Sequence, residues 1–181
     1  MLPRRVETNF HEDSGMSFGN DEHTDSVTMR GRDWPSLRQF CVFMENRVGG
    51  LYDLLRHLER NEIRVVALSI ANSVDCAIVR VMVNNTDRAR EVFQLSKFAF
   101  SESDLVGVEL PDDPQPYLRI CMALLAAEIN ISYTYPLLYR RHGRGAIAMY
   151  VDDVEMALRI LTEQGLTVIT ETNLEDDDEF F

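Results

Sequence analysis

Hydrophobic residues in the first half of the chain follow two periods, one typical of strands and one typical of helices. From Arg38 to Asn46 apolar side chains tend to alternate with other residues, as in a strand. After a Gly49-Gly50 turn, four leucines recur at i, i+3, i+4 and i+7, which is one face of an amphipathic helix. These leucines are Leu51, Leu54, Leu55 and Leu58.

The same half continues with two strands and a second helix. Residues 63–70 and 77–83 are rich in β-branched side chains and predict strands, with a turn at 73–75 between them. A polar cap at 84–86 precedes a helix that turns Ala89, Val92 and Phe93 inward. An extended segment, residues 98–110, follows this helix.

The second half repeats this order of patterns. A strand at 106–110 leads through a proline-rich turn, residues 111–116, into a helix whose apolar face begins at Tyr117. Strands are expected at 129–137, 145–151 and 166–170, with a turn at 140–145 and a capped helix before Gly165.

Each copy therefore has the order β-α-β-β-α-β, which is the ferredoxin-like plan. The segment 98–110 serves twice, because it closes the first copy and opens the second. We expect an α+β fold of two repeats, residues 37–104 and 105–174, whose antiparallel sheets meet edge to edge with helices on one face.

Charge is concentrated at the two ends of the chain. The net charge is −12, of which residues 1–27 carry −4 and residues 171–181 carry −6. We expect residues 1–36 to form a disordered acidic tail and residues 175–181 a second acidic tail. The nearly neutral middle lacks the basic footprint of a nucleic-acid-binding protein, which argues against that class.

Composition also limits the cellular locations and the kinds of chemistry that we expect for this protein. No apolar run is long enough to cross a bilayer, and the start of the chain lacks a secretory signal. The 3 cysteines have no paired spacing, so we expect reduced thiols and a cytoplasmic protein without a metal or cofactor. No serine or cysteine has a base beside it, so we expect no catalysis.

Residues 37–174 resemble proteins with two fused ACT domains, which are small amino-acid-sensing modules. The resemblance rests on the segments 45–51 and 63–69 and on the repeated element order. The first loop of the family reads roughly Asp/Asn-x-Pro-Gly-x-Leu, and here Asn46, Gly49 and Leu51 match while Val48 replaces the proline. In the second copy Gln115 stands in place of the glycine.

The resemblance implies that an amino acid binds between paired ACT units, at the first loop of one unit and a second-strand segment of its neighbour. A helix N-terminus favours a carboxylate, and glycine allows it to approach the backbone. The implied site comprises Asn46, Arg47, Val48, Gly49, Gly50 and Leu51, faced by Leu68 and Ser69 of another subunit or by Tyr133 and Tyr135 of the same chain. The implied weaker second site comprises Asp112, Asp113, Pro114 and Gln115.

Two other clusters allow two interpretations each. The basic segment 140–144 is either a phosphate or carboxylate site or, as we favour, a solvated hairpin turn. The tyrosines of the second copy either line a pocket or pack within the sheet. They are Tyr133, Tyr135, Tyr139 and Tyr150.

The first helix of the second copy has an additional apolar stripe formed by Leu118, Met122 and Leu125. A sheet covers only one side of a helix, so this stripe predicts contact with a partner subunit and hence a homodimer or larger assembly. We expect a regulatory protein that binds an amino acid and modulates an enzyme or pathway of amino-acid metabolism. The alternative is a structural dimerisation or scaffold subunit that has lost ligand binding.

Overall fold

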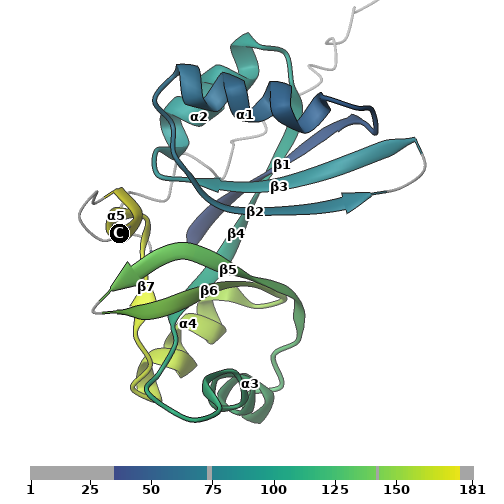
Figure 1. Ribbon diagram of the computed structural model, residues 1–181. Helices are drawn as coiled ribbons and strands as arrows, with labels where there is room; N and C mark the ends of the chain where they lie inside the picture. Colours follow the sequence, from purple (N-terminus) through teal and green to yellow (C-terminus); the bar gives the residue numbers. More distant parts are fainter. Residues whose placement is uncertain (1–34, 73–74, 142, 176–181) are drawn as a thin grey trace, which may run out of the picture.

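The fold contains the β-α-β-β-α-β unit twice (Figure 1). The computed structural model describes residues 35–72, 75–141 and 143–175. Its elements are β1 (Leu37–Glu45), α1 (Gly50–Arg60), β2 (Val65–Asn72), β3 (Cys76–Val83), α2 (Thr86–Leu95), β4 (Ala99–Glu109), α3 (Pro116–Ala126), β5 (Ile131–Arg141), β6 (Arg144–Val151), α4 (Val154–Glu163), β7 (Val168–Ile169) and α5 (Glu171–Glu175).

Both sheets are antiparallel and have the same strand order. The first repeat is ordered β2-β3-β1-β4 and the second β5-β6-β4-β7. Strand β4 belongs to both, because residues 99–105 pair with β1 and residues 106–109 pair with β6. The prediction that one segment closes the first copy and opens the second is confirmed. The domain boundary expected between residues 104 and 105 therefore lies within strand β4.

The two repeats agree in backbone detail at the ends of their second helices, α2 and α4. Asn85 caps α2 and Asp153 caps α4, each accepting a hydrogen bond from a backbone N–H three residues later. Lys97 and Gly165 then follow these helices with φ of 58° and 69°. This agreement confirms that the internal repeat of the sequence is a repeat of structure.

The helices cover the outer faces of the two sheets, and the opposite faces of the sheets pack against each other (Figure 1). One apolar core lies under α1 and α2, and another under α3 and α4. A third core lies between the sheets and includes Leu37, Met82, Leu137 and Ala148. The junction through β4 is therefore accompanied by face-to-face packing, which the sequence pattern did not predict.

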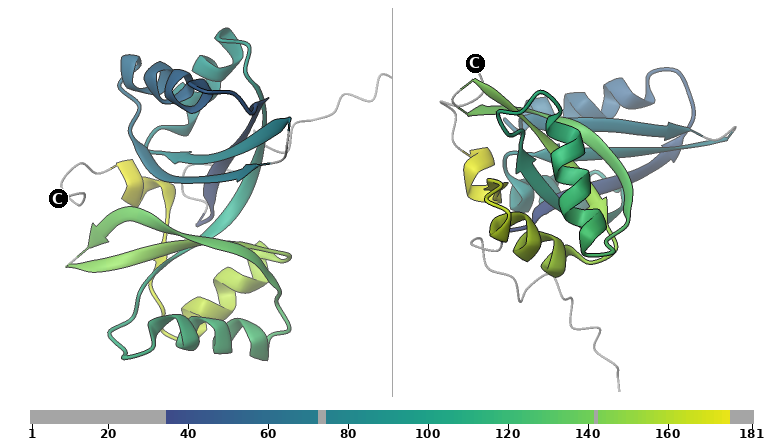
Figure 2. Two further views of the ribbon diagram at one scale, coloured as in Figure 1. Left: turned by 45° about the vertical axis from the view of Figure 1, so that its right-hand side comes forward. Right: turned by 90° about the horizontal axis from the view of Figure 1, so that it is seen from below.

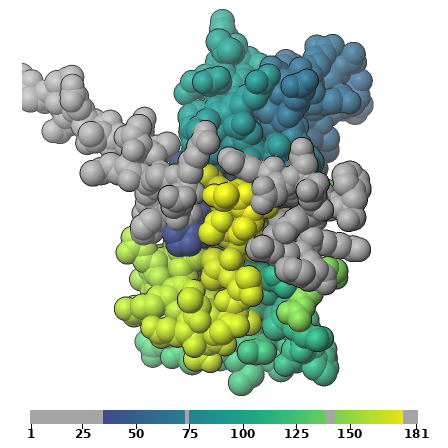
Figure 3. Space-filling view, turned by 90° about the vertical axis from the view of Figure 1, so that its left-hand side faces the viewer, coloured from purple at the N-terminus to yellow at the C-terminus, as the bar shows by residue number. Residues whose placement is uncertain are grey.

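The C-terminal segment crosses from the second repeat to the first (Figure 3). Leu174 of α5 is buried in the core between the sheets, and Glu171 Oε1 accepts a hydrogen bond of 3.0 Å from the backbone N–H of Arg38 in β1. Residues 1–34 and 176–181 lie outside the described residues. The predictions that concern the two tails therefore stay predictions.

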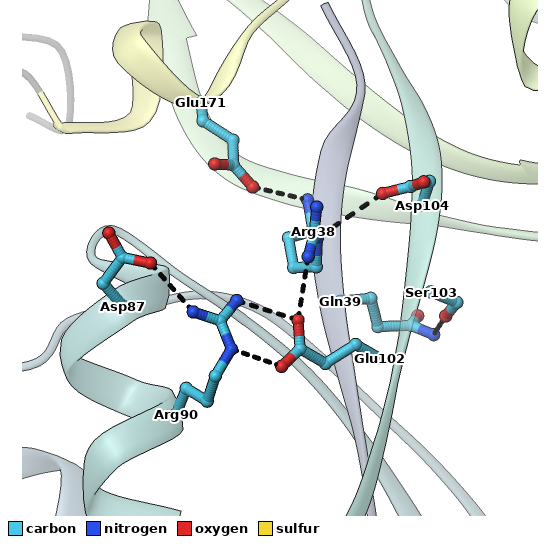
Figure 4. Close-up of polar contacts among 8 residues, drawn as sticks. All are labelled: Arg38, Gln39, Asp87, Arg90, Glu102, Ser103, Asp104 and Glu171. Atoms are coloured by element: carbon cyan, nitrogen blue, oxygen red, sulfur yellow. Dashed lines mark hydrogen bonds and ion pairs between the residues drawn. The ribbon is translucent and has the colours of Figure 1, made fainter. Parts of the chain in front are cut away.

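A cluster of ion pairs links β1, α2 and β4 near this contact (Figure 4). Arg90 donates to both oxygens of Glu102 at 2.6 and 2.9 Å, and Arg38 Nη1 donates to Glu102 Oε2 at 2.9 Å. Burial alone would raise the pKa of Glu102, but the hydrogen bonds from the two arginines lower it below its ordinary value. Burial raises the pKa of Glu171, although the Arg38 charge and its backbone N–H act to lower it.

Candidate ligand-binding site

The loop between β1 and α1 has the geometry of an open helix N-terminus. Gly49 is the N-cap residue, with φ of 88° and ψ of −13°. Residues other than glycine and asparagine rarely adopt this left-handed backbone conformation. Among the described residues, no atom beyond those of Gly49 and its two chain neighbours lies within 4 Å of the position that a Cβ at Gly49 would occupy. The loop is exposed from Asn46 to Gly49, so a ligand could reach the backbone there.

Backbone donors at this loop lie in the first turn of α1. The N–H of Gly50 donates to Arg47 O, and the N–H of Asp53 donates to Gly49 O as the first bond of the helix. The N–H groups of Leu51 and Tyr52 have no acceptor within the helix, because the residues four positions earlier precede it. Together with the helix dipole, these donors favour a small carboxylate.

The equivalent loop of the second repeat, residues 112–115, offers fewer donors. Gln115 occupies the position of Gly49, and its N–H donates to Asp113 Oδ1 at 2.8 Å. Pro116 begins α3 and has no N–H to offer. The Asp112 carboxylate lies 4.0 Å from Arg144 Nη2 and adds negative charge to the loop. These features disfavour a second carboxylate here, in line with the weaker site expected from the sequence.

The second-strand residues Leu68 and Ser69 lie away from the loop of their own chain. They belong to β2, which is the edge strand of the first sheet. Leu68 pairs with Val81 of β3, which pairs with Phe40 of β1. Phe40 is six residues before Asn46, or roughly 20 Å along the strand. Within one chain the two segments do not form a common site, so a contribution from another subunit stays a prediction.

Tyr133 and Tyr135 lie between the two sheets. The hydroxyl of Tyr135 donates to Gln39 Oε1 at 2.5 Å, and Gln39 Nε2 donates to the hydroxyl of Tyr133 at 3.0 Å. Gln39 precedes Asn46 by seven residues, roughly 23 Å of extended strand. The structure therefore separates these tyrosines from the loop of their own chain, and of the two interpretations it supports packing between sheets.

Gln39 is a polar residue that the sequence analysis did not select. It is fully buried, and Ser103 Oγ and Cys41 Sγ also lie 3.0 and 3.1 Å from its amide nitrogen, so its two N–H hydrogens are shared among three acceptors. Arg80 lies over the ring of Tyr133, with 4.4 Å between the guanidinium carbon and the ring centroid. Burial raises the pKa of the Tyr135 hydroxyl, which keeps it a hydrogen-bond donor. Because most of these contacts join residues 64 to 96 positions apart, no local pattern could have shown them.

The apolar stripe expected to contact a partner lies on the outer face of α3. Leu118, Met122 and Leu125 are 56%, 61% and 74% exposed. A groove of about 420 Å³ runs beside the stripe, and its apolar lining comprises Leu118, Met122, Ala123, Ala126 and Leu166. No part of the described chain covers this face.

The basic segment 140–144 joins β5 and β6 as a hairpin. Arg141 pairs with Arg144, and Gly143 in the turn has φ of 79°. Arg144 Nη1 lies 3.6 Å from Glu109 Oε1, which ties the start of β6 to the end of β4. His142 lies outside the described residues.

Two further observations concern the described ranges only. No helix in them is long and apolar enough to cross a membrane. No group of three or more His, Cys, Asp or Glu side chains among these residues is arranged to hold a metal ion.

The fold and the loop define a class of protein, a pair of fused ferredoxin-like modules with one open β-α loop. The chain belongs to the family described as ACT domain pair, which matches residues 36–177. This membership confirms the resemblance found in the sequence and supports a ligand-binding regulatory role.

A solved structure agrees with this fold. Protein BT0572 from Bacteroides thetaiotaomicron is 23% identical over 78% of this chain and 96% of its own, with a TM-score of 0.71. The regulatory subunit of aspartate kinase from Thermus thermophilus, in its ligand-free form, is 15% identical over 74% of this chain and 95% of its own, with a TM-score of 0.49. No curated protein sequence matches the chain significantly.

Proposed function

We propose that this protein is a non-catalytic regulator that binds a free amino acid at the loop 46–51 and passes the occupancy of that site to a partner enzyme of amino-acid metabolism. The observation that carries the proposal is the left-handed, uncovered Gly49 at the start of α1. It leaves the N–H groups of Leu51 and Tyr52, which have no acceptor within the helix, available to an α-carboxylate. The 3 cysteines are free, which is consistent with the cytoplasmic location that we also propose.

The remaining wall of the site would come from β2 of a second subunit. β2 is an edge strand, and Leu68 and Ile70 on it are partly exposed. A ligand held between the loop of one subunit and the edge of another would stabilise the assembled form relative to the separated one. Such a preference is what a regulator needs in order to act on a partner.

The test is a thermal-shift screen against the twenty amino acids, followed by calorimetry on each amino acid that raises the melting temperature. Gly49→Asn is the informative variant, because asparagine tolerates the left-handed conformation and places a side chain over the open loop. Gly165→Asn is the matched control, since Gly165 also has φ of 69° and open space around its Cβ position. We expect at least a tenfold loss of affinity in Gly49→Asn and no change in Gly165→Asn.

Two outcomes would overturn parts of this proposal. Full affinity in a folded Gly49→Asn protein would place the ligand elsewhere. No response to any amino acid would favour the alternative function, a structural scaffold subunit without ligand binding.

A further inference from the structure

The strands of the first sheet extend beyond the second repeat on one side of the molecule (Figure 2). Gln39, Cys41 and Phe43 of β1 share the face that is turned toward the second repeat, because side chains two positions apart on a strand point the same way. Gln39 is fully buried, Cys41 is half-buried and Phe43 is 45% exposed. The cover provided by the second repeat therefore ends along β1, and part of this face is open.

Two rows of side chains cross the open part of the face. One row carries hydrogen-bond donors and runs across β2, β3, β1 and β4. Its residues are Ser69, Arg80, Cys41 and Ser101. The next row is apolar and crosses the same four strands. Its residues are Ala71, Ile78, Phe43 and Ala99.

Arg80 is held in place on this face by the second repeat. Its guanidinium carbon lies 4.4 Å from the ring centroid of Tyr133, and Tyr133 is stacked on Tyr150 with 5.1 Å between the ring centroids. Gln39 Nε2 lies 3.0 Å from the Tyr133 hydroxyl, so the ring is anchored at its hydroxyl as well. A guanidinium that stacks through its face keeps the N–H groups of its edge available, and these suit a carboxylate.

The positive charge of Arg80 is not neutralised by a neighbouring acid. Among the described residues, no carboxylate lies within ion-pair distance of its guanidinium. Glu45 shares the face but follows Cys41 by four residues, roughly 13 Å along β1. Asp152, just after β6, accepts a hydrogen bond of 3.1 Å from the backbone N–H of Asn130. The face therefore combines an uncompensated cation with an apolar row.

The second repeat shows that the fold does not require an arginine at this position. When Val83 is aligned with Val151, Arg80 corresponds to Ala148 and Ser69 corresponds to Tyr135. Ala148 and Tyr135 are 0% and 7% exposed and belong to the core between the sheets. The same backbone positions thus serve packing in one repeat and carry accessible donors in the other.

We propose that this face binds a small monocarboxylate with an apolar side group. The carboxylate accepts from the edge N–H groups of Arg80 and from the hydroxyl of Ser69 on the neighbouring strand. The apolar group lies over Phe43 and Ile78, one row or roughly 7 Å further along the strands. A free amino acid fits less well, because its α-ammonium group finds no carboxylate in either row. The site is separate from the loop 46–51 and does not depend on the function proposed for that loop.

The size of the face fits a small molecule and not a protein. Even when the row of Glu45 and Cys76 is included, the open part spans roughly 15 Å across four strands and 14 Å along them, an area of about 200 Å². A stable protein interface buries about 800 Å² on each partner. The charge and the area therefore point to the same class of ligand.

The first test is calorimetry of 3-phenylpropionate with the full chain. Arg80→Gln should weaken binding by about tenfold or more, because it removes the charge and the fork of donors. Arg60→Gln, at an exposed arginine at the end of α1, is the matched control and should leave the affinity unchanged. Gly49→Asn should also leave it unchanged, which separates this site from the loop 46–51. No binding to the wild type, full affinity in a folded Arg80→Gln protein, or a loss in Gly49→Asn would overturn the proposal.

The second test varies the ligand in the Gly49→Asn protein, where the loop 46–51 does not contribute. 3-Phenylpropanamide lacks the charge, acetate lacks the apolar group, and phenylalanine adds an ammonium group. Each should bind about tenfold or more weakly than 3-phenylpropionate. Phe43→Ser should reduce the affinity for 3-phenylpropionate toward that for acetate. Tighter binding of phenylalanine or of inorganic phosphate would contradict the proposed ligand class.

The third test locates the ligand on the wild-type protein, without any substitution. Titration with 3-phenylpropionate should shift the NMR signals of the Ile78 methyl groups and of the Tyr133 ring. The methyl groups of Ile160, on α4 at the outer face of the second repeat, are the internal control and should not shift. Shifts at the loop 46–51 without shifts at Ile78 and Tyr133 would place the ligand elsewhere and overturn the proposal.

Discussion

The two repeats have nearly the same backbone but differ at the residues that face outward. Copy one has Gly49 at its first loop and a polar face on α1, whereas copy two has Gln115 at the equivalent loop and an apolar face on α3. Most buried positions of the helices and the caps of α2 and α4 agree between the copies. Each repeat therefore acts as an internal control for the other. Positions that agree are needed by the fold, and positions that differ are free to serve binding.

The largest expected effect comes from the shared core positions. Leu58→Ala and Leu124→Ala each remove a fully buried side chain at the same place in one repeat. We expect each to lower the free energy of unfolding by about 2–5 kcal/mol. Denaturant titration would measure this, and Leu95→Ala, at an 84% exposed position, is the control with little change. A large effect at only one of the two positions would break the equivalence of the repeats.

The ion cluster of copy one has no counterpart in copy two, where Leu158 and Thr170 occupy the places of Arg90 and Glu102. Glu102→Gln leaves two arginines without their shared carboxylate, and we expect a loss of about 2–3 kcal/mol at neutral pH. Asp87→Asn, at a largely exposed carboxylate, should cost well under about 1 kcal/mol.

The effect of Glu102→Gln should depend on pH with a defined sign. The pKa of Glu102 is lowered in the folded state from an ordinary value of 4.5, so its stabilisation is present above that value and is lost as the pH falls through the folded pKa. The difference between wild type and Glu102→Gln should therefore shrink on acidification below about pH 4. Glu171 acts in the opposite direction, since burial raises its pKa. A difference that does not change with pH would mean that the ionised form is not what stabilises the cluster.

The helix caps should give smaller and equal effects. Asn85→Ala and Asp153→Ala each remove one hydrogen bond to a backbone N–H at a helix start. We expect each to cost about 1 kcal/mol in thermal or denaturant unfolding. An exposed substitution within α2, Glu91→Ala, should stay within about 0.5 kcal/mol. Unequal costs at the two caps would show that the repeats differ in more than their outer faces.

The smallest effects are expected where the chain leaves α2 and α4. Both positions are left-handed, but Lys97 occupies one and Gly165 the other. Lys97→Gly should stabilise the protein and Gly165→Ala should destabilise it, each by about 0.5–1 kcal/mol. Melting temperatures measured on both variants would check the opposite signs. The same sign at both positions would contradict the equivalence of the two turns.

The repeat and the helices could be predicted because their signals are local. The spacing of Leu51 to Leu58 indicates the buried face of α1, where Leu54 and Leu58 are fully buried. The face expected to begin at Tyr117 is only partly right for α3, because Ile120 and Leu124 are buried while Tyr117 is 49% exposed. The double role of β4 followed from the absence of a linker between copies. The strand expected at 63–70 begins two residues later, at Val65. Glu62 adopts a left-handed conformation, and the N–H of Ile63 bonds back to Leu58 O before the strand begins.

The face-to-face packing of the sheets could not be predicted in the same way. Strand β1 is apolar on both faces, so its pattern does not say which face a second sheet will cover. Gln39 is buried only because Tyr133 and Tyr135 reach it from the other repeat. The sequence predicts an open loop at Gly49, but the left-handed conformation of this residue depends on the whole turn between β1 and α1. The second wall that we propose for the site would come from a second subunit, so the pattern of one chain could not show it.

Strand β4, with its 11 residues in two sheets, leaves the molecule without a hinge. Domains that rotate on ligand binding do so about a few flexible residues between them, and here the connection is a hydrogen-bonded strand along its whole length. A change at the loop 46–51 can reach the second repeat through the twist of that common strand or through the packing between the two sheets. For the same reason a break within β4 would disturb both repeats at once, because it would expose an unpaired edge in each sheet.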